Sequence, residues 1–266
     1  MGMIIDTHFH YLSMEKRNPE ANLDFDMTGI EVGLEGGDLR NRISAIGTRK
    51  SIFLSVGAGP WVLDREDFPS IDEEIGKLEE DILTYGADAI GECGIDNHWK
   101  YGTPELQEEL FIKQCGLAKK YDLPLIIHSR DADAELLQFA YNGYLNEKTI
   151  MHCFSSSTDV LKIVLDKGCY ISFAGNVTYK QNKHIQESAR YVPLDRILVE
   201  TDSPYLTPVP RRHESNNPQN TEHIIEFISN LRGIDKKNLK DMIFENFFHV
   251  IGSTESKVKR DISTIN

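Results

Sequence analysis

Short apolar runs rich in β-branched residues alternate with longer amphipathic stretches along most of the chain. The length and composition of the short runs are typical of strands that are buried in a parallel sheet. We therefore predict eight strands, at residues 4–8, about 28–34, 52–56, 89–92, 125–128, 150–153, 170–173 and 197–200.

The longer stretches between the runs have the period of an α-helix. In one of them, apolar residues recur at steps of four and three, which places them on one helix face: Ile71, Ile75, Leu78, Ile82 and Tyr85. Thr103-Pro104 indicates a helix start, because threonine caps a helix and proline suits its first position. Two more amphipathic stretches, 221–231 and 236–251, predict helices separated at Gly233.

The alternation of strands and helices predicts either a closed barrel or an open doubly wound sheet. No G-x-G-x-x-G or Walker-type loop follows any run, so dinucleotide and P-loop folds lack their fingerprint. The crossover at residues 11–26 contains Pro19 and no clear helical period, and we expect it to be irregular. We expect one domain over residues 1–266, with roughly the last ten residues forming a loose tail.

Composition and charge narrow the class of protein. The chain is 40% hydrophobic and 27% charged, with a formal net charge of −13. This charge argues against broad electrostatic attachment to nucleic acid, but not against a nuclease, because bound metal ions and a few local arginines neutralise a scissile phosphate. Four scattered cysteines indicate no disulfide framework. Without a membrane-spanning run or a signal-like start, we expect a cytoplasmic monomer.

Six polar residues that end or follow the predicted strands suggest chemistry. In an extended strand, alternate side chains point the same way, so His8 and His10 can converge on one ion. In a parallel barrel, residues at strand ends collect at the mouth, where catalytic residues normally lie. Each residue alone is most simply a satisfied polar group, but six at equivalent points predict a site for Zn2+, Mn2+ or a similar divalent ion. The six are His8, His10, Glu92, His128, His152 and Asp202.

Other polar residues have weaker claims to a role. Arg130 and Arg211 are candidates for clamping a phosphate, and Tyr205 is a candidate residue of the mouth. Glu200 either supports the ligands from behind or is an ordinary buried, paired carboxylate. His98 follows the glutamate motif, and two interpretations of it are open: it lines the mouth, or it has an ordinary position. The remaining histidines in helical stretches are ordinary packing or surface residues in our interpretation: His184, His223 and His249.

The motifs around these residues resemble those of the TatD family of amidohydrolase-like, metal-dependent barrels. The similar segments run from the N-terminus to about Pro218 and include Asp6-Thr7-His8-Phe9-His10, Gly91-Glu92-Cys93-Gly94-Ile95-Asp96, Ile127-His128-Ser129-Arg130-Asp131-Ala132, His152-Cys153-Phe154-Ser155 and Glu200-Thr201-Asp202-Ser203-Pro204. The resemblance implies an α/β fold, a (β/α)8 TIM-type barrel, and two adjacent divalent ions. It implies that His8, His10, Glu92 and Asp202 hold one ion, and that Glu92 bridges to a second ion completed by His128 and His152.

The resemblance also implies a reaction. Members of this family are described as metal-dependent deoxyribonucleases, and some relatives as D-aminoacyl-tRNA deacylases. We expect a phosphodiesterase, with DNA as its partner, in which metal-activated water attacks, Asp202 acts as general base and Glu92 sets the metal spacing. The alternatives are an ester or amide hydrolase on the same site and a non-catalytic scaffold. The chain departs from the family where relatives often read Gly-x-His-Pro, because it reads Gly57-Ala58-Gly59-Pro60 and so has glycine in place of the histidine.

Overall fold

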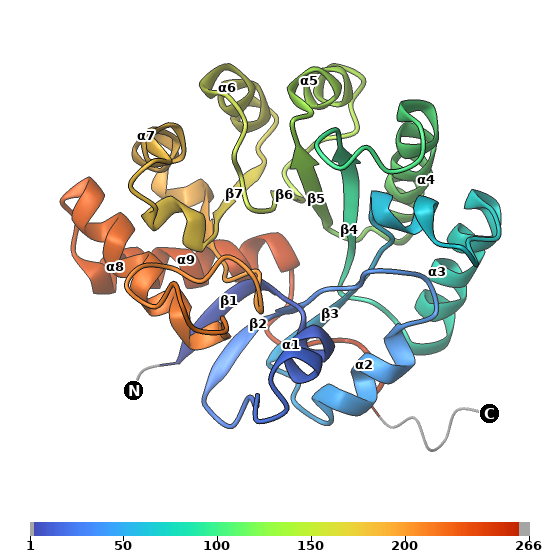
Figure 1. Ribbon diagram of the computed structural model, residues 1–266, viewed down its shortest axis with the longest axis horizontal. Coiled ribbons are helices and arrows are strands. Elements are labelled where there is room, and N and C mark those ends of the chain that lie inside the picture. The colour runs from blue at the N-terminus through green and yellow to red at the C-terminus, as the bar shows by residue number, and fades with distance from the viewer. Residues whose placement is uncertain (1–2, 261–266) are drawn as a thin grey trace.

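Eight parallel strands in chain order form the centre of the computed structural model, which describes residues 3–260 (Figure 1). Each strand pairs with the next one along the sequence, from β1 to β8. The strands are β1 (Ile4–Phe9), β2 (Met27–Glu31), β3 (Ile52–Val56), β4 (Ala89–Asp96), β5 (Leu125–Arg130), β6 (Thr149–Met151), β7 (Tyr170–Phe173) and β8 (Ile197–Val199). All eight predicted strands are confirmed, with shifts of a few residues at their ends.

The contact between the last and the first strand decides between the two predicted architectures. The Thr7 hydroxyl donates a hydrogen bond to the Val199 carbonyl at 3.0 Å. The backbone N–H of His10 donates to the Ser203 carbonyl at 2.9 Å, beside a parallel bridge from Phe9 to Ser203. These bonds join the two edges of the sheet, so the fold is a (β/α)8 barrel and not an open sheet.

Helices lie on the outer side of the strands (Figure 1). The α-helices are α1 (Tyr11–Arg17), α2 (Leu39–Ile46), α3 (Ile71–Tyr85), α4 (Pro104–Tyr121), α5 (Asp133–Tyr141), α6 (Thr158–Asp166), α7 (Lys183–Tyr191), α8 (Thr221–Arg232) and α9 (Lys236–Ile251). Short 3-10 helices are η1 (Pro60–Asp64), η2 (Gly175–Thr178), η3 (Leu194–Arg196) and η4 (Pro218–Asn220). The predicted start of α4 is confirmed, because the Thr103 side chain accepts from the Leu106 N–H. Gly233 ends α8 with a φ of 65°, as predicted.

The crossover at residues 11–26 differs from the sequence prediction in its first half. Residues Tyr11–Arg17 form a two-turn helix, in which Tyr11 and Met14 are buried three positions apart. A helix this short shows too few apolar positions for a period to be recognised. The remainder is irregular as predicted, with Asn18 and Asn22 side chains accepting from backbone N–H groups two residues on.

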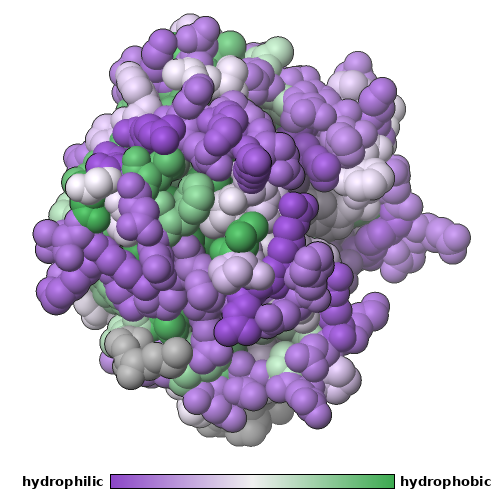
Figure 2. Space-filling model, turned by 60° about the vertical axis from the view of Figure 1, so that its left-hand side comes forward, coloured by the Kyte–Doolittle hydropathy of each residue, from purple (hydrophilic) through white to green (hydrophobic). Residues whose placement is uncertain are grey.

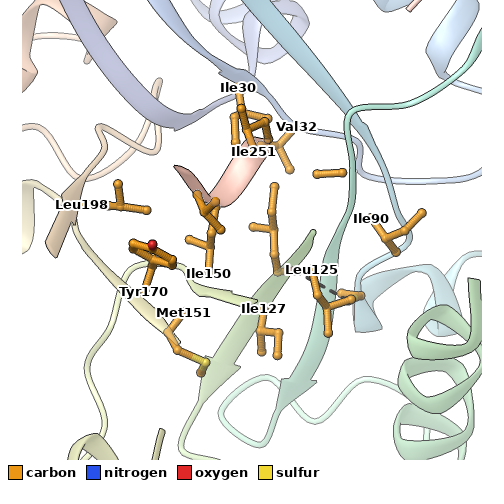
Figure 3. Packing of buried hydrophobic residues seen from close by; sticks show 14 of the residues in the cluster. Ile30, Val32, Ile90, Leu125, Ile127, Ile150, Met151, Tyr170, Leu198 and Ile251 are labelled. Atoms are coloured by element: carbon orange, nitrogen blue, oxygen red, sulfur yellow. Dashed lines mark hydrogen bonds between the residues drawn. The ribbon is translucent and has the colours of Figure 1, made fainter. Parts of the chain in front are cut away.

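The core is a single cluster of apolar side chains inside the barrel and between the barrel and its helices. Figure 3 shows apolar side chains from several strands, among them Ile30, Ile150 and Leu198, gathered in one cluster with Ile251 from the end of α9. Their burial fixes the strands rigidly, so that residues at the strand ends take defined positions.

The end of the described chain is attached to the barrel. The backbone N–H of Lys257 donates to Asp88 at 2.8 Å, and that of Lys259 donates to the Tyr85 carbonyl at 2.8 Å. Residues 261–266, the rest of the predicted loose tail, lie outside the described residues. Within residues 3–260, no helix has the length and apolar character needed to cross a membrane. The face drawn in Figure 2 is mostly hydrophilic, with its hydrophobic residues in small separate patches.

Candidate metal centre

The six residues predicted to bind metal come together at the carboxyl ends of the strands, and we call them the ligand cluster. His8 and His10 lie on and directly after β1, Glu92 lies on β4 and His128 on β5. His152 follows β6 directly, and Asp202 follows closely after β8. Because the strands are parallel, these positions meet at one mouth of the barrel.

Glu92 is the centre of the cluster, and its two oxygens face different histidine pairs. Oε2 lies 3.3 Å from Nε2 of His8 and 3.7 Å from Nε2 of His10. Oε1 lies 2.8 Å from Nδ1 of His128 and 3.4 Å from Nε2 of His152. One carboxylate therefore joins two groups of potential ligands.

Asp202 completes the first group from the segment after β8, the strand that joins β1 and closes the barrel. Its Oδ1 lies 3.4 Å from Nε2 of His10 and 3.8 Å from Nε2 of His8. Its backbone N–H donates to the His8 carbonyl at 2.9 Å, and Asp6 accepts from the N–H of the preceding Thr201 at 2.9 Å. The Asp202 side chain is 16% exposed against 5% for Glu92. Asp202 is thus the cluster carboxylate with the freer access to solvent.

The distances within the cluster fit a bound divalent ion. The ligand atoms of His8, His10 and Glu92 all lie within 4.8 Å of one another. The same holds for the ligand atoms of Glu92, His128 and His152. Ligand atoms about 2.1 Å from one ion lie roughly 3–3.5 Å apart, close to the separations found here. Nε2 of His8 and Nε2 of His10 are 3.2 Å apart, so without a metal one nitrogen can donate a hydrogen bond to the other. A cation between them would instead take the lone pairs of both nitrogens.

Three of the histidines are oriented from behind. Nδ1 of His10 lies 3.2 Å from the Val32 carbonyl, which can only accept, so in the neutral ring Nε2 is the free nitrogen that faces the cluster. Nδ1 of His152 lies 2.6 Å from Oε1 of Glu200. Nε2 of His128 lies 3.1 Å from Oδ2 of Asp96. Such partners fix the direction of a ligand ring and raise its basicity.

Glu200 is fully buried and lies beside His152, a position that is compatible with both interpretations of this residue. The role of Asp96 was missed at the sequence level. The signal was present, because Asp96 follows Glu92 by four positions in one strand and so faces the same side.

The cluster shifts the pKa values of its members strongly. Burial by itself raises the pKa of Glu92, but His152, His8 and His128 outweigh it and hold that pKa well below its ordinary value. Burial also lowers the pKa of His152, yet Glu200 and Glu92 outweigh it and raise the pKa to about 10. The pKa of His10 and that of His128 are raised too, whereas burial lowers that of His8. A metal ion would displace protons from the histidine nitrogens that bind it.

A cavity of about 550 Å³ opens over the cluster, and we call it the mouth cavity. Arg130 lines it, with its guanidinium 5.6 Å from the centroid of the Trp99 ring. Tyr205 also lines it, 49% exposed and 6.5 Å from the His10 ring. The other lining residues outside the cluster are Leu34, Trp61, Asp96, Trp99 and Tyr101.

Two sequence candidates lie outside the lining of the mouth cavity. Arg211 is exposed, and its guanidinium donates to both oxygens of Glu214 at 3.0 and 3.1 Å. His98 is exposed as well, and its Nδ1 lies 3.3 Å from Asp131. The loop after β8 has no regular period, and the sequence alone did not separate the residues that face the cavity from those that do not.

Trp61 explains the glycine at position 59. A Cβ added at Gly59 would lie 2.1 Å from the Trp61 ring, although φ at Gly59 is −77° and any residue adopts that value. The indole is held by a 3.0 Å hydrogen bond to the Leu34 carbonyl, and its ring lies 5.8 Å from that of His128. The tryptophan therefore occupies the space that a side chain at position 59 would fill.

Known proteins with similar sequences are described as metal-dependent hydrolases. A family model described as TatD related DNase matches residues 5–252. The metal-dependent hydrolase YcfH of Escherichia coli strain K12 is 34% identical over 218 residues, which are 80% of each chain. The metal-dependent hydrolase YabD of Bacillus subtilis is 31% identical over 252 residues, 92% of this chain and 97% of YabD.

A solved structure shows the same fold. YJJV, a TatD homolog from Escherichia coli K12, superposes with a TM-score of 0.79 over 94% of this chain and 98% of its own, at 22% identity. The resemblance inferred from the motifs is confirmed by the family match over nearly the whole chain. The chain belongs to the TatD family of metal-dependent hydrolases.

Proposed function

We propose that this protein is a phosphodiesterase, specifically a deoxyribonuclease, that hydrolyses DNA with water activated by two divalent metal ions. The observation that carries the proposal is the arrangement of Glu92, whose two oxygens face two separate histidine pairs. The match to a family model described as TatD related DNase supports DNA as the substrate.

The donor set divides between the two ions through Glu92. His8, His10 and Asp202 would hold one ion with it, and His128 and His152 would hold the other. Four imidazoles favour Zn2+, while the carboxylates also suit Mn2+ or Mg2+. When bound, such ions supply Lewis acidity and make water a nucleophile at neutral pH.

The chain's own groups position the substrate and move the proton. Asp202 reaches the mouth cavity and takes the proton from the attacking water. Arg130 offers a planar cation to a phosphate oxygen, and Tyr205 offers a ring face to a base. The contact predicted for Arg211 stays a prediction, because a phosphate there would have to replace the carboxylate of Glu214.

Release of acid-soluble nucleotides from single-stranded and duplex DNA tests the proposal. We expect wild-type activity to require a divalent metal and to be lost in Asp202→Asn and in His128→Ala. His184→Ala is the matched control, because this histidine is exposed on α7 outside the cluster.

The outcome also separates the alternatives. Hydrolysis of carboxylic esters or of D-aminoacyl-tRNA, with metal bound and DNA untouched, would replace the nuclease by an acyl hydrolase on the same site. Bound metal without hydrolysis of either class would favour the non-catalytic scaffold.

A further inference from the structure

A second cavity lies directly beside the mouth cavity, and we call it the side cavity. Its volume is about 590 Å³. Tyr205 lines both cavities, so its ring forms the wall between them. The side cavity is lined by α1 through Arg17, by Tyr179 after η2, and by the β8–α8 loop through Arg212 and His213.

Two arginines of the side cavity are held by aromatic rings. The guanidinium of Arg212 lies 3.9 Å from the centroid of the Tyr179 ring. That ring is buried and fixed, since its hydroxyl donates to the Thr207 carbonyl at 2.9 Å. The guanidinium of Arg17 lies 6.0 Å from the centroid of the Tyr205 ring. A ring face orients a cation but, unlike a carboxylate, leaves its positive charge available.

The positive charge of these arginines is not cancelled by nearby acids. Among residues 3–260, neither Arg17 nor Arg212 has a carboxylate oxygen within 4.0 Å. Glu214 lines the same cavity, but its two oxygens accept hydrogen bonds from Arg211. In a chain with a net charge of −13, this is a place where an anion meets uncompensated positive charge.

The opposite side of the mouth has the opposite character. A cavity of about 480 Å³ between the β5–α5 and β6–α6 loops is lined by Asp131, Asp133 and Glu135 together with serines. A polyanion that enters the mouth is therefore repelled on the β5–β6 side and attracted on the β8 side. A negatively charged nucleic-acid strand should therefore extend from the mouth toward the β8 side.

We propose that the side cavity binds a backbone phosphate of single-stranded DNA, next to the nucleotide whose phosphodiester lies at the ligand cluster. Arg17 and Arg212 contact that phosphate, and the ring of Tyr205 stacks on a base between the two cavities. This inference rests on the proposed nuclease function and names its substrate as an oligonucleotide that spans both cavities.

Binding of a fluorescein-labelled, phosphorothioate-linked DNA decamer to the metal-loaded protein tests the side cavity without hydrolysis. Each phosphate that the protein neutralises contributes about 0.7 to the slope of log affinity against log salt for single strands. Because Arg17 and Arg212 share one phosphate, we expect the double variant Arg17→Gln/Arg212→Gln to lower that slope by about 0.7 and each single variant to lower it by less. We expect Arg212→Lys to restore the slope, because it keeps the charge.

Arg190→Gln is the control, because Arg190 is exposed near the end of α7, away from the barrel mouth. It should leave the slope unchanged. Equal slopes in the wild type and in the double variant would overturn the side cavity as a phosphate site, whatever the activity.

Steady-state hydrolysis separates this proposal from the proposed function. We expect the double variant to raise KM for the unmodified decamer while KM for a dinucleotide and kcat for both stay at wild-type values. Equal loss on both substrates would overturn the side cavity as a subsite. Salt-dependent binding through the arginines without any hydrolysis by the wild type would support the subsite and retire the nuclease.

Discussion

The ligand cluster and the side cavity hold their polar side chains in different ways. In the cluster, His152 is buried between Glu92 and Glu200, and His128 lies between Glu92 and Asp96. In the side cavity, Arg212 is exposed and rests on a single aromatic face. Groups held from two sides suit chemistry that requires fixed geometry, and groups held from one side suit a flexible substrate. We therefore expect changes in the cluster to lower kcat and changes in the side cavity to raise KM.

The largest effect is expected from Glu92→Gln, which tests the cluster at its centre. An amide has one oxygen and no charge, so it cannot serve both histidine pairs. We expect kcat on DNA to fall at least about a thousandfold, which corresponds to about 4 kcal/mol of transition-state stabilisation. Elemental analysis should find less metal per chain. A variant with full metal content and near wild-type kcat would refute the central role of Glu92, and exposed Glu187→Gln is the control.

Glu200→Gln probes the support behind the cluster and should have the second largest effect. The change keeps the size of the side chain but removes the charge beside Nδ1 of His152. We expect metal affinity or activity to fall roughly 10- to 100-fold, as for other second-sphere partners of ligands. Metal titration of the apoprotein measures the affinity. Unchanged affinity would show that Glu200 serves packing alone.

Arg130→Gln tests whether Arg130 behaves like the ligand cluster or like the side cavity. Arg130 lines the mouth cavity but is held by the Trp99 ring, like the arginines of the side cavity. We expect KM for DNA to rise about tenfold, or about 1.4 kcal/mol, with little change in kcat. Arg130→Lys should recover part of the loss. A fall in kcat without a change in KM would instead place Arg130 with the cluster.

Gly59→Ala should have the smallest effect, and on stability more than on activity. The added methyl overlaps the Trp61 ring, which must turn away. We expect a loss of about 1 kcal/mol, or roughly 2–4 °C in Tm, by differential scanning fluorimetry. Adding Trp61→Phe should return part of the loss. A Tm equal to that of the wild type would show that the indole adapts freely.

Residues carried by strands could be predicted from the sequence, because a strand has a fixed period and a fixed end. His8, Glu92 and His128 follow apolar runs, and parallel strands bring such positions together. Asp96 was within reach of the same argument, since it shares a strand face with Glu92.

Residues carried by loops could not be predicted in this way. Arg211 and Arg212 are adjacent and chemically identical, yet one pairs with Glu214 and the other rests on Tyr179, 33 positions earlier in the chain. Nothing in a local pattern separates them, because the separation depends on where the chain turns. The helix α1 was missed for a related reason, since its two buried residues are too few to define a period.

The overlap between position 59 and the Trp61 ring also constrains how this wall of the mouth can evolve. Two side chains that compete for one volume cannot both be present, so a side chain at position 59 and the Trp61 indole in its present place exclude each other. A larger residue introduced at position 59 before the indole is lost creates an overpacked intermediate, whereas the reverse order leaves a gap in the intermediate. The two positions should therefore be inherited as a pair, and their exchange is epistatic.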